Sequence, residues 1–201
     1  MKVILAKNSG FCMGVRRAVD EAKKTYGNGV YILGEIIHNE SVIAEINALG
    51  TKTVDSPDEI PCGTVIIRSH GVGKSVYDRL NERGIKIIDC TCPFVLKIHN
   101  IVEKYYSLGY KIVITGEKTH PEVVGINGWC DNSAVIVDED YESIDFSEDE
   151  KICLVSQTTY STERFKKILE FFSKKTVKTL EVFETICYTT RERQEEAEIL
   201  S

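Results

Sequence analysis

An internal repeat limits the folds open to this chain more than any other property of its sequence. The segment Gly34–Glu40 (GEIIHNE) matches Gly116–Glu122 (GEKTHPE) 82 residues later, and Val65–Gly71 resembles Ile152–Thr158 87 residues later. Similarity at a nearly fixed separation indicates repeated structural units that pack against one another. The sequence therefore predicts two copies of one unit, each roughly 80–90 residues long.

Short runs rich in Val and Ile alternate with helical patterns along the chain. The runs are mostly continuous rather than alternating, which is typical of parallel strands covered on both faces. Helical stripes such as Val15, Ala18, Val19 and Ala22 lie between them. This alternation predicts an α/β fold built from repeated small parallel-sheet units. Strands are expected at residues 2–6, 30–34, 64–68, 85–89, 111–115, 133–137, 151–155 and 179–183.

A second repeated element consists of a strand, a short turn, a cysteine and a helix with basic residues. It occurs three times, and its cysteines are Cys12, Cys92 and Cys187. We therefore expect a first α/β unit at residues 1–92, a second at 93–186 and the start of a third at 187–201. Because the third copy stops at Ser201, we expect the natural protein to be longer by about 80 residues. The basic residues are Arg16 and Arg17, Lys97, and Arg191 and Arg193.

Composition excludes several classes of protein. A hydrophobic fraction of 42% and a charged fraction of 28% are ordinary for a soluble globular protein. No apolar run approaches the ~18 residues that a membrane span needs, and the N-terminal apolar stretch is too short for a secretory signal. An isoelectric point near 5.4 without a Lys/Arg cluster argues against nucleic-acid binding. We expect a cytoplasmic protein with neither a membrane nor a nucleic acid as partner.

The polar candidate residues follow the strands at their carboxyl ends, where open parallel sheets bind ligands. If the units pack around a shared axis, these residues meet in one central cavity. Each of the three repeated cysteines also precedes a helix, whose first N–H groups and dipole favour a thiolate, so we expect lowered thiol pKa values. The residues concerned are Cys12, His38, His70, Cys92, His120, Thr158 and Cys187.

Three thiolates suit either an iron–sulfur cluster or a zinc ion with a fourth His ligand. A cluster held by three cysteines would leave one iron open to substrate. The separations of 80 and 95 residues argue against a zinc ribbon, whose ligands come in close pairs. Buried structural thiols are the plainer alternative. The remaining cysteines lack the repeated context and are interpreted as structural: Cys62, Cys90, Cys130 and Cys153.

The histidines divide in the same way. His38 and His120 occupy the same repeat position, and His70 follows a strand. An imidazole beside a cavity can donate to a phosphate or carboxylate, while a hydrogen-bonded turn histidine is the alternative. His99 lies within a predicted helix, away from any strand end, and is interpreted as structural.

Glu122 and the Gln157–Thr159 segment each have two interpretations. Glu122 stands at the predicted start of a helix, where it is either a capping acid or a proton donor into a desolvated pocket. The hydroxyls of Thr158 and Thr159 either relay that proton or cap the helix that follows.

At these residues the chain resembles the 4-hydroxy-3-methylbut-2-enyl diphosphate reductases, the LytB or IspH family. The matching motifs cover nearly the whole chain in the family's order. They are Gly10–Val15 (GFCMGV), Glu35–Asn39 (EIIHN), Ser69–Val72 (SHGV), Asp89–Pro93 (DCTCP), His120–Val123 (HPEV), Ser156–Thr159 (SQTT), and Ile186–Tyr188 (ICY) with Thr189, Thr190, Arg191 and Gln194.

The resemblance implies a cytoplasmic oxidoreductase of the non-mevalonate isoprenoid pathway. Such enzymes reduce an allylic alcohol diphosphate to isopentenyl and dimethylallyl diphosphate, with electrons from ferredoxin or flavodoxin delivered through a 4Fe–4S cluster. By motif, the cluster ligands would be Cys12, Cys92 and Cys187. His38, His70 and His120 would hold the diphosphate, Glu122 would donate the proton, and Thr158 would contact the substrate oxygen.

The family continues with a third unit that carries a Ser-x-Asn motif and a later Ser for the diphosphate. The resemblance therefore implies an active longer parent and weak or absent turnover by these 201 residues. Two alternatives stay open. One is a non-redox iron–sulfur hydro-lyase, and the other is a zinc-binding structural or regulatory module.

Overall fold

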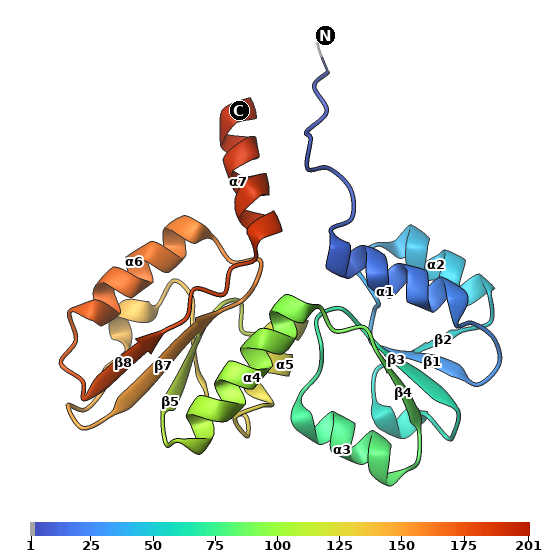
Figure 1. Cartoon of the computed structure of the whole chain (residues 1–201), viewed down its shortest axis with the longest axis horizontal. Coiled ribbons are helices and arrows are strands. Elements are labelled where there is room, and N and C mark those ends of the chain that lie inside the picture. The colour runs from blue at the N-terminus through green and yellow to red at the C-terminus, as the bar shows by residue number, and fades with distance from the viewer. Residues whose placement is uncertain (1–2) are drawn as a thin grey trace.

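Two parallel four-stranded sheets, each flanked by helices, form the molecule. The computed structural model describes residues 3–201 (Figure 1). The first sheet has the strand order β2-β1-β3-β4 and the second has β6-β5-β7-β8. Every pairing is parallel. The predicted α/β fold of repeated parallel-sheet units is therefore confirmed.

The first sheet and its helices occupy the N-terminal part of the chain. Its strands are β1 (Val30–Leu33), β2 (Lys52–Val54), β3 (Thr64–Ile67) and β4 (Lys86–Asp89). Its helices are α1 (Met13–Lys24), α2 (Glu40–Ala48), the short 3-10 helix η1 (Pro57–Glu59) and α3 (Lys74–Glu82).

The second sheet repeats this arrangement. Its strands are β5 (Lys111–Thr115), β6 (Val135–Val137), β7 (Lys151–Ser156) and β8 (Thr179–Val182). Its helices are α4 (Pro93–Ser107), α5 (Pro121–Asn127), the 3-10 helix η2 (Tyr141–Ser143), α6 (Thr162–Ser173) and α7 (Tyr188–Leu200). In Figure 1, α4 and α5 lie between the two sheets.

The central strands explain why the repeat folds this way. The central strands of each sheet, β1 and β3 in the first and β5 and β7 in the second, are continuous Val/Ile-rich runs, as expected where both faces are covered. Ile66 in β3 and Ile114 in β5 are fully buried. Strands β1 and β5 occupy equivalent positions in their sheets. The two copies of the repeated His motif, which follow these strands, therefore begin at the carboxyl ends of equivalent strands. Each sheet has its own apolar clusters on its two faces.

The strand predicted at residues 2–6 is wrong for the described residues 3–6, which form no strand, and Lys2 lies outside the described part. Val3 and Leu5 are 80% and 82% exposed. A strand needs a neighbouring edge to receive its hydrogen bonds, and none of the strands described pairs with this segment. The structure also adds β2, whose three residues are too short for a clear pattern. Within residues 3–201, no helix is both long and apolar enough to cross a bilayer.

Candidate functional site

The three repeated cysteines stand at the N-terminal caps of three helices. Cys12 caps α1, Cys92 caps α4 and Cys187 caps α7. All three line one cavity of about 170 Å³. A Cβ atom added to Gly14 would lie 2.7 Å from the Cys92 sulfur, so this sulfur packs against the first turn of α1. The fold therefore brings together cysteines that are far apart in the sequence. Other residues lining the cavity include Ser69, His70, Phe94, Glu122, Thr158 and Arg193.

The segment before Cys12 is tied to the last helix, α7. Arg193 donates from Nε to the Asn8 carbonyl at 3.0 Å, and from Nη2 to the Gly10 carbonyl. The Glu196 carboxylate accepts from the backbone N–H groups of Lys7 and Asn8 at 2.6 and 3.0 Å. These contacts place the Cys12 turn beside the Cys187 helix, and Figure 1 shows the segment before α1 and helix α7 extending on the same side of the molecule.

Three further hydrogen bonds hold the segments of Cys92 and Cys187 in place. Arg17 of α1 donates to the Thr91 carbonyl at 2.6 Å, directly before Cys92. The Cys92 N–H itself donates to the Ser69 carbonyl at 2.9 Å, and the Cys187 N–H donates to the Thr158 carbonyl at 2.9 Å. Two of the basic residues that recur after the cysteines, Arg17 and Arg193, therefore act as links between cysteine segments.

The expected lowering of the thiol pKa is wrong for Cys92. Burial raises the pKa of this thiol, although the backbone N–H groups of Phe94 and Val95 act in the opposite direction. Cys12 and Cys187 raise it further, because each would repel a second thiolate at close range. The cost of desolvation thus exceeds what the helix N-terminus supplies.

The other four cysteines lie apart from this cavity. Cys90, Cys130 and Cys153 are at most 2% exposed and pack in the apolar clusters. Burial raises the pKa of Cys90 to about 11 and that of Cys153 to about 12. Cys62 is exposed. Their surroundings fit the structural interpretation.

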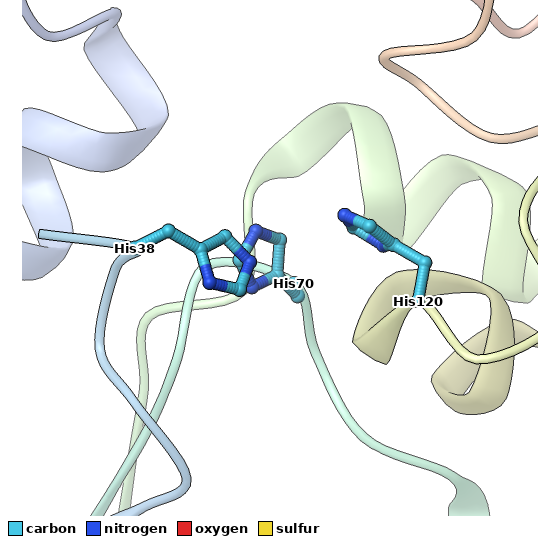
Figure 2. A group of neighbouring side chains, drawn as sticks. All are labelled: His38, His70 and His120. Atoms are coloured by element: carbon cyan, nitrogen blue, oxygen red, sulfur yellow. The ribbon is translucent and has the colours of Figure 1, made fainter.

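Three histidines gather into one cluster, and Figure 2 shows their side chains pointing toward one another. The ring centroids of His38 and His70 are 5.0 Å apart, those of His38 and His120 are 5.9 Å apart, and those of His70 and His120 are 5.4 Å apart. One nitrogen from each ring lies within 4.8 Å of the others. His38 follows β1, His70 follows β3, and His120 caps α5, so both sheets contribute.

The hydrogen bonds of this histidine cluster favour an anion over a metal ion. The His120 Nδ1 accepts the Glu122 backbone N–H at 3.1 Å, so the ring proton of neutral His120 sits on Nε2, which then donates. A metal ion binds a ring nitrogen through its lone pair. In this tautomer the lone pair of Nδ1 is already used by the Glu122 N–H, and Nε2 carries the proton. His38 lies 3.4 Å from the Glu35 carboxylate through Nδ1. Burial, and next the proximity of His120, lower the pKa of His70 to about 3. Burial also lowers the pKa of His120, with His38 second.

Arg68 stands beside this cluster, although it was not among the site residues predicted from the sequence. Its charge contributes to the lowered pKa values of His70 and His120. Its own pKa is lowered by burial, while Glu35 and Asp55 raise it, and its Nε is buried with no hydrogen-bond partner among residues 3–201. The guanidinium fills the space where a side chain on Gly34 would lie. Its place in the sequence could have indicated this role, because Arg68 directly follows strand β3 and stands two residues before His70.

Glu122 and Thr158 form a buried pair. Glu122 is 1% exposed, and its two carboxylate oxygens accept from the Thr158 backbone N–H and hydroxyl, each at 2.6 Å. Burial raises the pKa of Glu122, and the two hydrogen bonds oppose this. The Glu122 side chain therefore does not cap α5. Ser161 caps α6, so Thr158 and Thr159 are not its caps either.

The family comparison agrees with this geometry. A family model described as "LytB protein" matches residues 3–201. The chain belongs to the LytB family. Curated LytB relatives from Thermoanaerobacter sp. (strain X514) and Clostridioides difficile (strain 630) are 45% and 43% identical over the whole chain. The chain covers 72% and 74% of their respective lengths, and both are named 4-hydroxy-3-methylbut-2-enyl diphosphate reductase.

Solved structures of LytB proteins share the fold. The reductase from Plasmodium falciparum has a TM-score of 0.84 at 28% identity, covering 92% of this chain and 61% of that chain. A second reductase, described as the terminal enzyme of the non-mevalonate pathway, has a TM-score of 0.80 at 37% identity. It covers 98% of this chain and 72% of that chain. The resemblance inferred from the motifs is therefore confirmed at the level of the family.

Proposed function

We propose that this chain carries most of the active site of a 4-hydroxy-3-methylbut-2-enyl diphosphate reductase. One observation carries the proposal: the three cysteines, Glu122 and Thr158 line a single cavity, and His70 borders it. His70 also belongs to the histidine cluster. A diphosphate held by the histidines would therefore place the rest of a short substrate in the cavity. The names of the LytB relatives support the same substrate.

The thiols fit an iron–sulfur cluster bound by three protein ligands. They come from three separate helix caps yet meet at one cavity, and the surrounding N–H groups offset part of the negative charge. When bound, a 4Fe–4S cluster would supply electrons and one iron free of protein ligands. We infer that Cys12, Cys92 and Cys187 are those ligands, and that ferredoxin or flavodoxin is the electron donor in a cytoplasmic setting.

The histidine cluster and Arg68 suit a diphosphate. The His120 Nε2 proton points away from the helix cap and is free to donate to a phosphate oxygen. Neutral His70 and His120 bring little charge of their own, so Arg68 supplies the fixed positive charge nearby. An arriving phosphate group would in turn favour protonation of the imidazoles, which strengthens each hydrogen bond.

Glu122 is suited to delivering a proton. Its raised pKa keeps the acid protonated closer to neutral pH than an exposed carboxyl. A protonated Glu122 donates to the Thr158 hydroxyl, which rotates and donates onward to the substrate oxygen. The substrate hydroxyl then leaves as water, and the balance of the reaction is two electrons and two protons consumed per substrate.

We also propose the unit boundaries 1–92, 93–186 and 187–201 for this family member. The matched relatives are longer than this chain. In the family, the additional unit contributes further diphosphate contacts. We therefore expect weak turnover by the 201-residue chain alone and full activity when the remaining unit is supplied.

Anaerobic purification with iron, sulfide and zinc analysis tests the metal centre. We expect brown protein containing iron and sulfide, because the sulfur cavity fits a cluster. Cys12→Ser, Cys92→Ser and Cys187→Ser should each remove most of the iron, whereas Cys62→Ser, at an exposed cysteine, should retain it. Colourless protein with stoichiometric zinc would support the structural zinc module instead. Consumption of reduced methyl viologen by the full-length parent on adding the allylic diphosphate separates the reductase from a hydro-lyase.

A further inference from the structure

The loop that carries His70 is held by residues of the second unit. The indole Nε1 of Trp129, which follows α5, donates to the Val72 carbonyl at 3.0 Å. The ring of His99, in α4, stacks on Trp129 with centroids 4.9 Å apart and planes 19° apart. The hydrogen bond reaches the loop two residues after His70.

The Cε1–Nε2 edge of the His99 ring lies directly against this loop. Gly71 has φ +68°, and a Cβ atom there would lie 2.6 Å from His99 Cε1. A second close approach occurs at Gly73, two residues after Gly71. A Cβ atom added to Gly128 would lie 2.6 Å from the Cα atom of Gly73. The glycines thus let the loop backbone approach the second unit more closely than other residues would allow.

His99 takes part in this contact as a neutral ring. It is 1% exposed, and neither ring nitrogen has a hydrogen-bond partner among the residues described. Burial lowers its pKa to about 4. Burying an imidazole without hydrogen bonds costs free energy. The contribution of His99 to the fold is therefore the packing of its ring against Trp129 and Gly71. These contacts fit the structural interpretation of His99 and extend it to the loop that carries His70.

We propose that Trp129 and His99 are positioning residues that align His70 with His120. His38 and His70 come from the first unit and His120 from the second, so the cluster forms only if the two units keep a fixed relation. The Trp129–Val72 hydrogen bond and the stacked rings of His99 and Trp129 lie where the two units meet. The inference rests on the proposed function of the histidine cluster as a diphosphate site.

The test uses inorganic diphosphate and the purified chain. The chain has four histidines, so imidazole NMR signals are few enough to assign. In the wild type we expect ring-to-ring nuclear Overhauser contacts between His70 and His120, and diphosphate-dependent shifts of His38, His70 and His120. Trp129→Phe keeps an aromatic ring for the stack but loses the N–H donor. We expect it to weaken those ring contacts and to raise the diphosphate dissociation constant roughly threefold to tenfold.

Tyr106→Phe is the matched control in the same unit. It removes a hydroxyl that donates to Asp131 at 3.2 Å and that makes no hydrogen bond to the described residues of the His70 loop, so it should leave both readouts unchanged. If Trp129→Phe does not fold, His99→Leu provides the second variant with the same expected result. Wild-type ring contacts and wild-type affinity in a folded variant would overturn the positioning role. Absence of diphosphate binding by the wild type would overturn the proposed anion site, while the ring contacts would still test the positioning role.

Discussion

At the scale of single residues, Glu122 shows burial and hydrogen bonding acting in opposite directions. Desolvation favours the neutral acid, and the two bonds from Thr158 favour the carboxylate. Burial is the larger cause, so the pKa rises. A carboxyl group in this state is suited to give up a proton when a nearby oxygen becomes more basic.

Glu122→Gln tests this raised pKa through stability. A folded-state pKa above the ordinary 4.5 means that the folded protein holds the proton more tightly than the unfolded chain. The stability that this tighter proton binding adds is fully present below pH 4.5, the ordinary pKa. It is lost as the pH rises through the raised pKa of the folded state. Gln cannot ionise. The free energy of unfolding of the wild type, minus that of the variant, should therefore fall as the pH rises above 4.5, measured by urea titrations at a series of pH values. A difference independent of pH would contradict the raised pKa.

Arg68 should contribute to anion binding through its fixed charge. Arg68→Met keeps the length of the side chain and removes the guanidinium, and we expect inorganic diphosphate to bind roughly tenfold to a hundredfold more weakly, from about 1.5–3 kcal/mol. Isothermal titration calorimetry measures this. Arg79→Met, which removes an exposed ion pair with Asp58, is the control and should bind as the wild type does. Equal affinity in both variants would show that Arg68 lies outside the anion site.

At the scale of elements, α7 has a role beyond presenting Cys187. None of its residues is buried, yet it is tied at several points to distant segments. Gln194 accepts from the Thr162 N–H and hydroxyl, which joins α7 to the start of α6. Arg193 and Glu196 hold the segment before Cys12. The helix therefore connects two of the three cysteines.

Arg193→Met should loosen that connection without disturbing a hydrophobic core. Two hydrogen bonds to the carbonyls of Asn8 and Gly10 are lost, so the Cys12 turn is no longer fixed beside Cys187. We expect less iron and sulfide per chain after anaerobic reconstitution, measured by chemical analysis and visible absorbance. Arg164→Met, which breaks exposed ion pairs of α6, should reconstitute as the wild type does. Full loading of Arg193→Met would show that the tether is dispensable.

At the scale of the whole molecule, the two sheets have separate hydrophobic cores. The clusters around Ile66 and Val65 belong to the first sheet, and those around Leu154 and Ile114 belong to the second. The two sheets share no apolar cluster among the described residues, and they are joined by contacts such as the Trp129–Val72 hydrogen bond and the Lys74–Glu103 ion pair. We therefore expect each sheet to open on its own.

Ile66→Ala tests the proposed separation into units. Ile66 is fully buried in β3, so the truncation should lower the free energy of unfolding by about 2–5 kcal/mol. Native-state hydrogen exchange should show the loss at residues 30–33, 64–67 and 86–89, while residues 111–115 and 151–156 keep their protection. Equal loss of protection in both sheets would show instead that the molecule opens as one unit.

Much of the fold was predictable because its signals are local. Continuous Val/Ile runs indicate covered parallel strands, and the recurring His and Cys motifs indicate that one arrangement is used twice. The segment at residues 3–6 carries the same apolar signal and forms no strand, because pairing depends on an available edge rather than on composition. The prediction of a lowered pKa at Cys92 was wrong for a similar reason. The helix N-terminus was recognisable in the sequence, but the burial that raises this pKa depends on the tertiary structure.

The sequence by itself determined the duplicated α/β units and the residue types placed at their strand ends, because backbone preference and hydrophobic period act over a few neighbouring residues. Only the tertiary structure decided that those residues meet. Cys12 approaches Cys187 through Arg193 and Asn8, and His70 faces His120 through contacts such as that between Trp129 and Val72. Such contacts join residues distant along the chain, and the geometry that they set depends on how whole sheets pack.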